Sequence, residues 1–124
     1  MKELIILLII FQIKHFIADF PLQGKYMLGK FKDGREWILP LIAHCSVHAL
    51  FTLIIVIVFN PQLWWLCLVD FILHFTMDRI KASKRLLGRF KPEQPYFWWS
   101  LGFDQMFHHL THYLIIWVLL ASAC

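Results

Sequence analysis

The chain has 124 residues, of which 60% are hydrophobic and 17% aromatic, and its formal net charge is +4. With a mean hydropathy of +0.64, this composition is typical of an integral membrane protein and predicts one small domain over residues 1–124. The excess of Lys and Arg could indicate nucleic-acid binding. Its confinement to two loops is better explained by membrane topology, so we expect no nucleic-acid partner.

Four apolar segments predict an all-α fold, a four-helix transmembrane bundle. They cover residues 4–20, 38–59, 63–77 continuing toward residue 80, and 97–123. A helix needs about 17 to 25 residues to cross the hydrocarbon, so the first segment is short and the third reaches this length only by including polar positions. The first segment resembles a secretion signal but lacks a small-residue cleavage site, and we expect it to be retained.

Charge in the connections predicts the orientation. Residues 22–37 carry four basic side chains, and residues 79–95 carry six against Glu93 alone, whereas the turn at residues 60–62 carries no charge. By the positive-inside rule, both basic loops are cytoplasmic and both termini lie outside, in a bacterial inner membrane. The second basic loop also contains apolar residues, as expected of a segment that lies on anionic lipid.

Polar residues recur four positions apart inside the apolar segments, so each set lies on one face of its helix. An ionised Asp at the bilayer centre costs about 2.5 to 3.5 kcal/mol, so these residues need partners within the membrane. Their depths along the predicted helices agree, which places them together in the inner half of the membrane, open to the cytoplasm. The sets are His15 with Asp19, His44 with His48, Asp70 with His74 and Asp78, and Asp104 with His108 and His112.

Imidazole and carboxylate groups on facing helices are typical ligands of Zn, Fe and Mn. One metal needs three or four ligands, and this set is large enough for two. We expect a divalent metal, most readily Zn, with Fe or Mn as alternatives. A hydrogen-bonded polar or proton network and haem ligation remain open readings of the same cluster. The expected metal ligands are His15, Asp19, His44, His48, His74, Asp78, Asp104 and His108.

Other residues of the pattern receive separate roles. Asp19 and Asp78 are the expected catalytic residues, with one of them as the base, and Gln23 and Lys81 are expected to bind substrate at the membrane face. Three residues are expected to support the ligands by hydrogen bonds, and Gln12 could do the same from the His15 face. His109 lies away from the helix face that carries Asp104 and His108, and it is expected to be a packing or interface residue. The cysteines lack a CxxC spacing, which predicts free thiols at all three positions. The three supporting residues are Asp70, Gln105 and His112, and the cysteines are Cys45, Cys67 and Cys124.

The segments HFIADFPLQ (15–23), HCSVH (44–48), HFTMDRIKA (74–82) and DQMFHH (104–109) resemble one family across nearly the whole chain. It comprises small bacterial and phage membrane proteins grouped as domain of unknown function thirty-three hundred and seven. The resemblance implies no activity, but it implies a functional set at the positions where the family's motifs recur. There is a looser similarity to membrane-bound metal-dependent hydrolases, by analogy only. The implied set is His15, Asp19, Phe20, Gln23, His44, His48, His74, Asp78, Lys81, Asp104, Gln105 and His108.

Three classes of function are compatible with these residues. The first is a membrane-embedded, metal-dependent hydrolase that acts on a lipid-like or phosphoester substrate at the cytoplasmic face. The second is a metal-ion or proton transporter, which at this length would have to form a homo-oligomer to enclose a pathway. The third is a di-iron or haem redox protein. We prefer the hydrolase, with membrane lipid as the expected partner.

Overall fold

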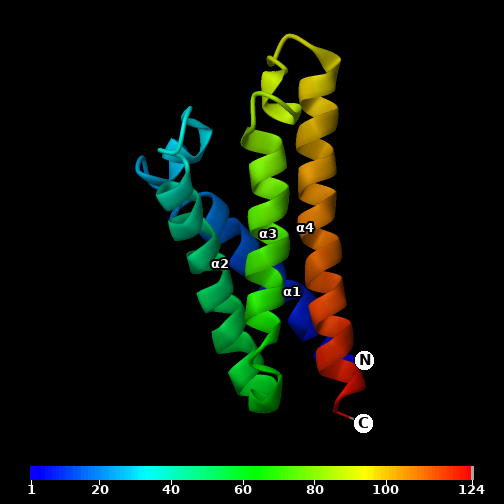
Figure 1. Ribbon diagram of the computed structural model, residues 1–124. Coiled ribbons are helices and arrows are strands. Elements are labelled where there is room, and N and C mark those ends of the chain that lie inside the picture. Colours follow the sequence, from blue (N-terminus) through cyan, green and yellow to red (C-terminus); the bar gives the residue numbers. More distant parts are fainter. Residues whose placement is uncertain (124) are drawn as a thin grey trace.

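The computed structural model describes residues 1–123, and over this range it is helical without strands (Figure 1). The all-α prediction with four main helices is therefore confirmed. The main helices are α1 (Lys2–Asp19), α2 (Ile38–Phe59), α3 (Leu66–Ala82) and α4 (Pro95–Ala121). Three short 3-10 helices lie in the connections: η1 (Met27–Phe31), η2 (Pro61–Leu63) and η3 (Leu87–Arg89).

The four helices form an up-and-down bundle. α3 packs between α2 and α4, and α1 lies behind them and contacts both α2 and α4 (Figure 1). The start of α1, the end of α4 and the α2–α3 turn lie at one end of the bundle, which we call the terminal end (Figure 1). The α1–α2 and α3–α4 connections lie at the opposite end, the loop end. Both basic loops are therefore on the same side of the molecule.

One helix, α2 (Ile38–Phe59), is long and apolar enough to cross a membrane by length and composition. The prediction of four such spans is therefore only partly met. In the other helices, polar positions interrupt the apolar sequence, and α3 has only 17 residues. The four-span topology and its orientation stay predictions.

The boundaries of α2 agree with the sequence at both ends, but the turn that follows differs from the prediction. Asn60 ends α2 in an extended conformation, and its side chain accepts a hydrogen bond from the backbone N–H of Gln62. Pro61 opens η2, and the third long helix, expected from residue 63, starts three residues later. α3 begins at Leu66, after Trp64 and Trp65 complete the turn. The shift leaves the periodicity of α3 unchanged, because the polar residues all lie after its start.

The interior of the bundle changes character along its axis. Toward the terminal end, apolar side chains from all four helices fill the core, and we call this group the apolar plug. Toward the loop end, the buried side chains are mostly histidine, aspartate and lysine. Each main helix contributes to both parts, because its polar residues lie on the same face as its buried apolar residues, one or more turns away. The apolar plug consists of Leu7, Phe11, Val56, Leu66, Ile115, Ile116 and Leu119.

The first basic connection folds back onto the bundle through η1. Gly29 lies against α2 so closely that a Cβ atom there would stand 2.8 Å from Cγ of Pro40. This contact places Lys30 in the interior, where only 5% of it is exposed. The sequence analysis had counted Lys30 only as one of four basic residues in this connection. In the structure it pairs with the buried carboxylate of Asp78.

Candidate metal centre

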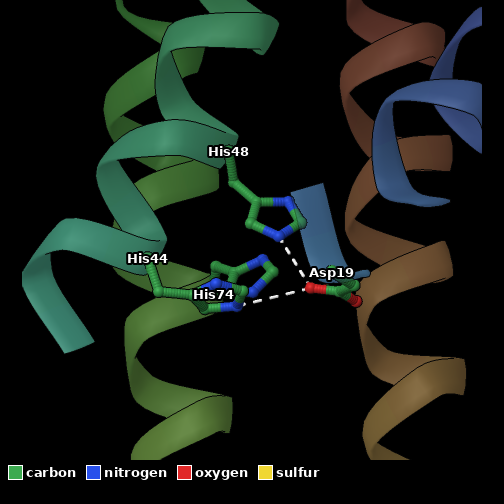
Figure 2. A group of neighbouring side chains, drawn as sticks. All are labelled: Asp19, His44, His48 and His74. Atoms are coloured by element: carbon green, nitrogen blue, oxygen red, sulfur yellow. Dashed lines mark hydrogen bonds and ion pairs between the residues drawn. The ribbon is translucent and has the colours of Figure 1, made fainter. Parts of the chain in front are cut away.

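Asp19, at the end of α1, faces histidines from two neighbouring helices (Figure 2). Its Oδ1 atom lies 2.8 Å from His48 Nε2 and 3.3 Å from His44 Nε2. Asp19, His44, His48 and His74 each offer one ligand atom, and these atoms all lie within 4.8 Å of one another. Three helices thus supply one carboxylate and three imidazoles, a donor set that suits a transition metal.

A second group adjoins the first and shares His74 with it. His74, Asp78 and His108 likewise offer ligand atoms within 4.8 Å of one another. Oδ1 of Asp78 lies 3.1 Å from His108 Nε2 and 3.6 Å from His74 Nε2, while its Oδ2 lies 3.3 Å from His44 Nε2. Asp78 therefore connects the two groups, and together they contain six of the eight predicted ligands.

His74 is the centre of both groups. Its ring lies between those of His48 and His108, with centroid distances of 3.9 Å and 4.0 Å. The side chain is 1% exposed, and neither ring nitrogen has a hydrogen-bond partner within residues 1–123. Nδ1 of His44 also has no hydrogen-bond partner there, whereas its Nε2 faces carboxylate oxygens of Asp19 and Asp78 at 3.3 Å. Leaving a buried polar atom without a partner costs about 1 to 3 kcal/mol, and metal coordination removes that cost.

The other two predicted ligands, His15 and Asp104, lie beside the groups. His15 Nε2 is 3.1 Å from Asp19 Oδ2 and 2.9 Å from Gln105 Oε1. Asp104 Oδ1 lies 3.1 Å from His108 Nε2, and its Oδ2 accepts a hydrogen bond from Gln105. In this arrangement both side chains contact ligands of the two groups. Gln105 joins them, which fits the supporting role predicted for it.

Two lysines form ion pairs with the carboxylates of Asp78 and Asp104. Lys30 Nζ lies 2.7 Å from Oδ2 of Asp78, and Lys81 Nζ lies 2.9 Å from Oδ2 of Asp104. In both carboxylates the other oxygen faces His108. Such outer partners fix the orientation of a ligating carboxylate. Sequence reasoning had selected Lys81 and missed Lys30, because its burial depends on the fold of η1.

The cluster opens at the loop end into a pocket of about 170 Å³. Gln23 lies in its wall, where its amide donates to the backbone oxygen of Asp19 and its Oε1 has no partner within the described chain. The predicted catalytic and substrate-binding residues therefore border one space. The pocket is lined by Asp19, Phe20, Gln23, Lys30, Phe31, Asp78, Lys81, Leu101, Asp104, Gln105 and His108.

A second polar layer lies one helical turn closer to the terminal end, and we call it the inner polar layer. Lys14 Nζ lies 2.7 Å from Asp70 Oδ2 and 3.4 Å from His112 Nε2. Thr52 donates to the same oxygen of Asp70. All four side chains are at most 3% exposed. Asp70 and His112 were expected to support the ligands. The contacts of Asp70 lie within this layer, whereas the ring of His112 also contacts that of His15, with centroids 5.6 Å apart. Lys14 and Thr52 were not anticipated.

The remaining sequence predictions concern residues at the edge of the cluster. Gln12 donates to His109 Nδ1 at 3.2 Å, so it contacts no ligand of the two groups. His109 is partly buried and lies outside both groups, as expected of a packing residue. Cys45 and Cys67 are free and buried. The third predicted free thiol, Cys124, lies outside the described residues.

A comparison with protein families matches residues 6–123 to the family described as "Protein of unknown function (DUF3307)". The chain belongs to this family. The match confirms the resemblance inferred from the four motifs, and it gives no support to the looser similarity to membrane-bound hydrolases. No curated protein and no solved structure matches the chain. The chemistry of the site therefore has to be argued from its own geometry.

Proposed function

We propose that this protein is a membrane-embedded, metal-dependent hydrolase of phosphoesters, with its site at the loop end of the bundle. The observation that carries the proposal is the pairing of two adjoining ligand groups with a lysine-lined pocket. His74 belongs to both groups, and the pocket reaches Asp19 of one group and Asp78 of the other. Two-metal sites of this kind are used by phosphatases and nucleases.

The donor set fits one or two divalent ions such as zinc. A bound ion would lower the pKa of its water ligand and polarise a phosphoryl oxygen. Asp19 is placed to take a proton from an attacking water, because its side chain is 14% exposed and its ion pairs within residues 1–123 are with histidines. Lys30 and Lys81 stand on the pocket side, where their charges would stabilise a phosphoryl group.

The distribution of apolar side chains supports a membrane location. On α1, Ile5, Ile9, Ile13 and Phe16 are each about half exposed and follow one face of the helix. The other helices show similar exposed apolar residues, whereas the interior holds charged and imidazole side chains. Water-soluble proteins rarely expose large continuous apolar patches, so lipid is the solvent that fits this surface.

A transporter is the alternative for which this geometry gives less support. A pathway needs polar groups along the whole bundle, and the inner polar layer does extend the cluster by one turn. Beyond it, the apolar plug closes the core with residues such as Leu7, Val56 and Ile115, which are 0% exposed. A polar interior that is closed at one end and open at the other fits a binding or catalytic site better than a conduit.

The test combines metal analysis with a hydrolysis screen. The protein is purified in detergent without chelator, its metals are measured, and it is assayed against phosphomonoesters and phosphodiesters with Zn²⁺ or Mn²⁺ added. We expect bound metal, and turnover that is lost in Asp19→Asn and Asp78→Asn. His109→Phe is the matched control and should retain both properties.

Two results would overturn the proposal. Folded wild-type protein that binds no added Zn²⁺, Mn²⁺ or Fe²⁺ would exclude the metal site and favour a polar network. The second is metal or proton flux in proteoliposomes that depends on Asp78, with no product from any ester. This result would instead support a transporter.

A further inference from the structure

Beside the polar pocket at the loop end lies an apolar groove of about 350 Å³. It is built by four elements: η1 contributes one aromatic residue, α3 contributes Lys81, η3 and the segment after it contribute apolar residues, and α4 forms the remaining wall. Most of these residues come from the basic connections, which the charge pattern had treated only as topology signals. The groove is lined by Phe31, Lys81, Leu87, Gly88, Phe90, Phe97, Ser100 and Leu101.

The groove and the polar pocket adjoin each other. Phe31, Lys81 and Leu101 line both of them. Lys81 stands at the junction, with its ammonium 2.9 Å from Asp104 in the pocket and its side chain at the groove wall. A ligand that filled both spaces would have an anionic end beside Lys30 and Lys81 and an apolar end among aromatic and aliphatic side chains.

A second apolar groove, between α1 and α4 near the terminal end, offers an internal comparison. Leu8, Ile116 and Ala121 are among the residues that line it. Its lining contains no charged side chain and no member of the metal cluster. Lipid chains of any kind could cover that surface. The loop-end groove differs because it leads to charged groups and to the candidate ligands.

Exposed aromatic residues lie beside the loop-end groove. Tyr96, Trp98 and Trp99 lie in the first turns of α4, beside the groove, and are more than half exposed. Tyr96 also contacts Phe90 of the groove wall, with ring centroids 5.3 Å apart. Aromatic residues of this type gather where acyl chains meet headgroups. A groove at this level would be accessible to amphiphiles from the membrane surface.

We propose that the substrate is an amphiphilic phosphate ester drawn from the membrane, with its alkyl chain in the loop-end groove and its phosphate in the polar pocket. This inference rests on the proposed function, because it names the substrate class of the same site. Ser100 is the position that tests it. Among residues 1–123, its hydroxyl bonds only the backbone oxygen of Tyr96 on its own helix, so a larger side chain there would fill the groove without breaking a contact between helices.

The experiment measures binding with probes that cannot be hydrolysed. Hexyl phosphonate and methyl phosphonate are titrated into detergent-purified, metal-loaded protein by calorimetry, with hexyl glucoside as the uncharged control. Each buried methylene should strengthen binding by about fourfold. We therefore expect hexyl phosphonate to bind at least tenfold more tightly than methyl phosphonate, and hexyl glucoside to bind weakly.

Two tryptophan variants test which of the two grooves binds the alkyl chain. Ser100→Trp should abolish the preference for the hexyl chain and leave methyl phosphonate binding and metal content unchanged. Ala121→Trp, which places the same side chain in the α1–α4 groove, should keep the preference. An unchanged preference in Ser100→Trp, or an equal loss in both variants, would overturn the inference.

The outcomes also distinguish this inference from the proposed function. Chain-dependent phosphonate binding without turnover of any ester would refute the hydrolase and leave the amphiphile site standing. Hydrolysis of a short soluble ester that Ser100→Trp leaves unchanged, with no advantage for longer chains, would support the hydrolase and refute the amphiphile. Loss of metal from Ser100→Trp would show that the groove is part of the metal site's structure, which also contradicts the inference.

Discussion

A His74→Phe substitution tests whether the cluster binds metal. A metal-bound site and a metal-free site predict changes in stability of opposite sign. The His74 ring is 1% exposed and lies between the rings of His48 and His108 at about 4 Å. Phenylalanine has a similar flat shape and offers no nitrogen. The substitution therefore keeps the packing of the three rings and removes the two nitrogens that have no hydrogen-bond partner within residues 1–123.

The two readings of the cluster predict opposite effects. Without a metal, each unpaired buried nitrogen costs about 1 to 3 kcal/mol, so removing both would stabilise the protein by about 2 kcal/mol or more. With a metal, His74 is a shared ligand and its loss weakens binding. A metal present at a thousand times its Kd stabilises the folded state by about 4 kcal/mol, and much of this would be lost. The net change is then a destabilisation.

The assay is thermal unfolding in detergent, with and without chelator, combined with elemental analysis. We expect His74→Phe to contain less metal and to unfold at a lower temperature than the metal-loaded wild type. After chelation, the order of the two proteins should reverse. His109→Phe serves as the control and should resemble the wild type throughout. A His74→Phe protein that retains its metal, or that is more stable than the untreated wild type, would refute the assignment.

Three further predictions concern single positions. Lys14→Met should destabilise the protein by about 3 to 5 kcal/mol, because it leaves the carboxylate of Asp70 buried without its cation. Adding Asp70→Leu should restore most of this stability, as measured by unfolding of the single and double mutants. Lys30→Met should retain bound metal but weaken phosphonate binding measured by calorimetry, and equal affinity would deny Lys30 a role in the pocket. In intact cells, an impermeant thiol reagent should label Gln62→Cys and not Arg85→Cys; the reverse labelling would invert the predicted orientation.

The helices and the cluster could be predicted from sequence because both depend on local spacing. The apolar segment predicted both boundaries of α2 correctly, because no polar residue lies within its first or last turn. Residues four positions apart share a helix face in any fold, so pairs such as His44 and His48 had to project together. Equal depth along four antiparallel helices then brought the pairs into contact. The all-α bundle and the meeting of its histidines needed no tertiary information beyond this.

The lysines could not be predicted in the same way. Lys14 lies next to His15 in an apolar segment, so its presence was a signal, but its pairing with Asp70 joins α1 to α3 across the interior of the bundle. Lys30 lies in a basic loop that resembles any cytoplasmic connection. Its burial depends on the contact between Gly29 and Pro40, which joins residues from separate elements. Spacing along one helix cannot report such contacts.

Charge balance gives a physical reason for the lysines to lie where they do. Asp19, Asp78 and Asp104 form the acidic part of the site, and Lys30 and Lys81 balance only two of these three charges. The third charge faces histidines, so either a protonated imidazole or a metal ion can balance it. A divalent ion that replaced an imidazole proton would add positive charge beside the pocket. Metal would therefore bind first, and an anionic ester second.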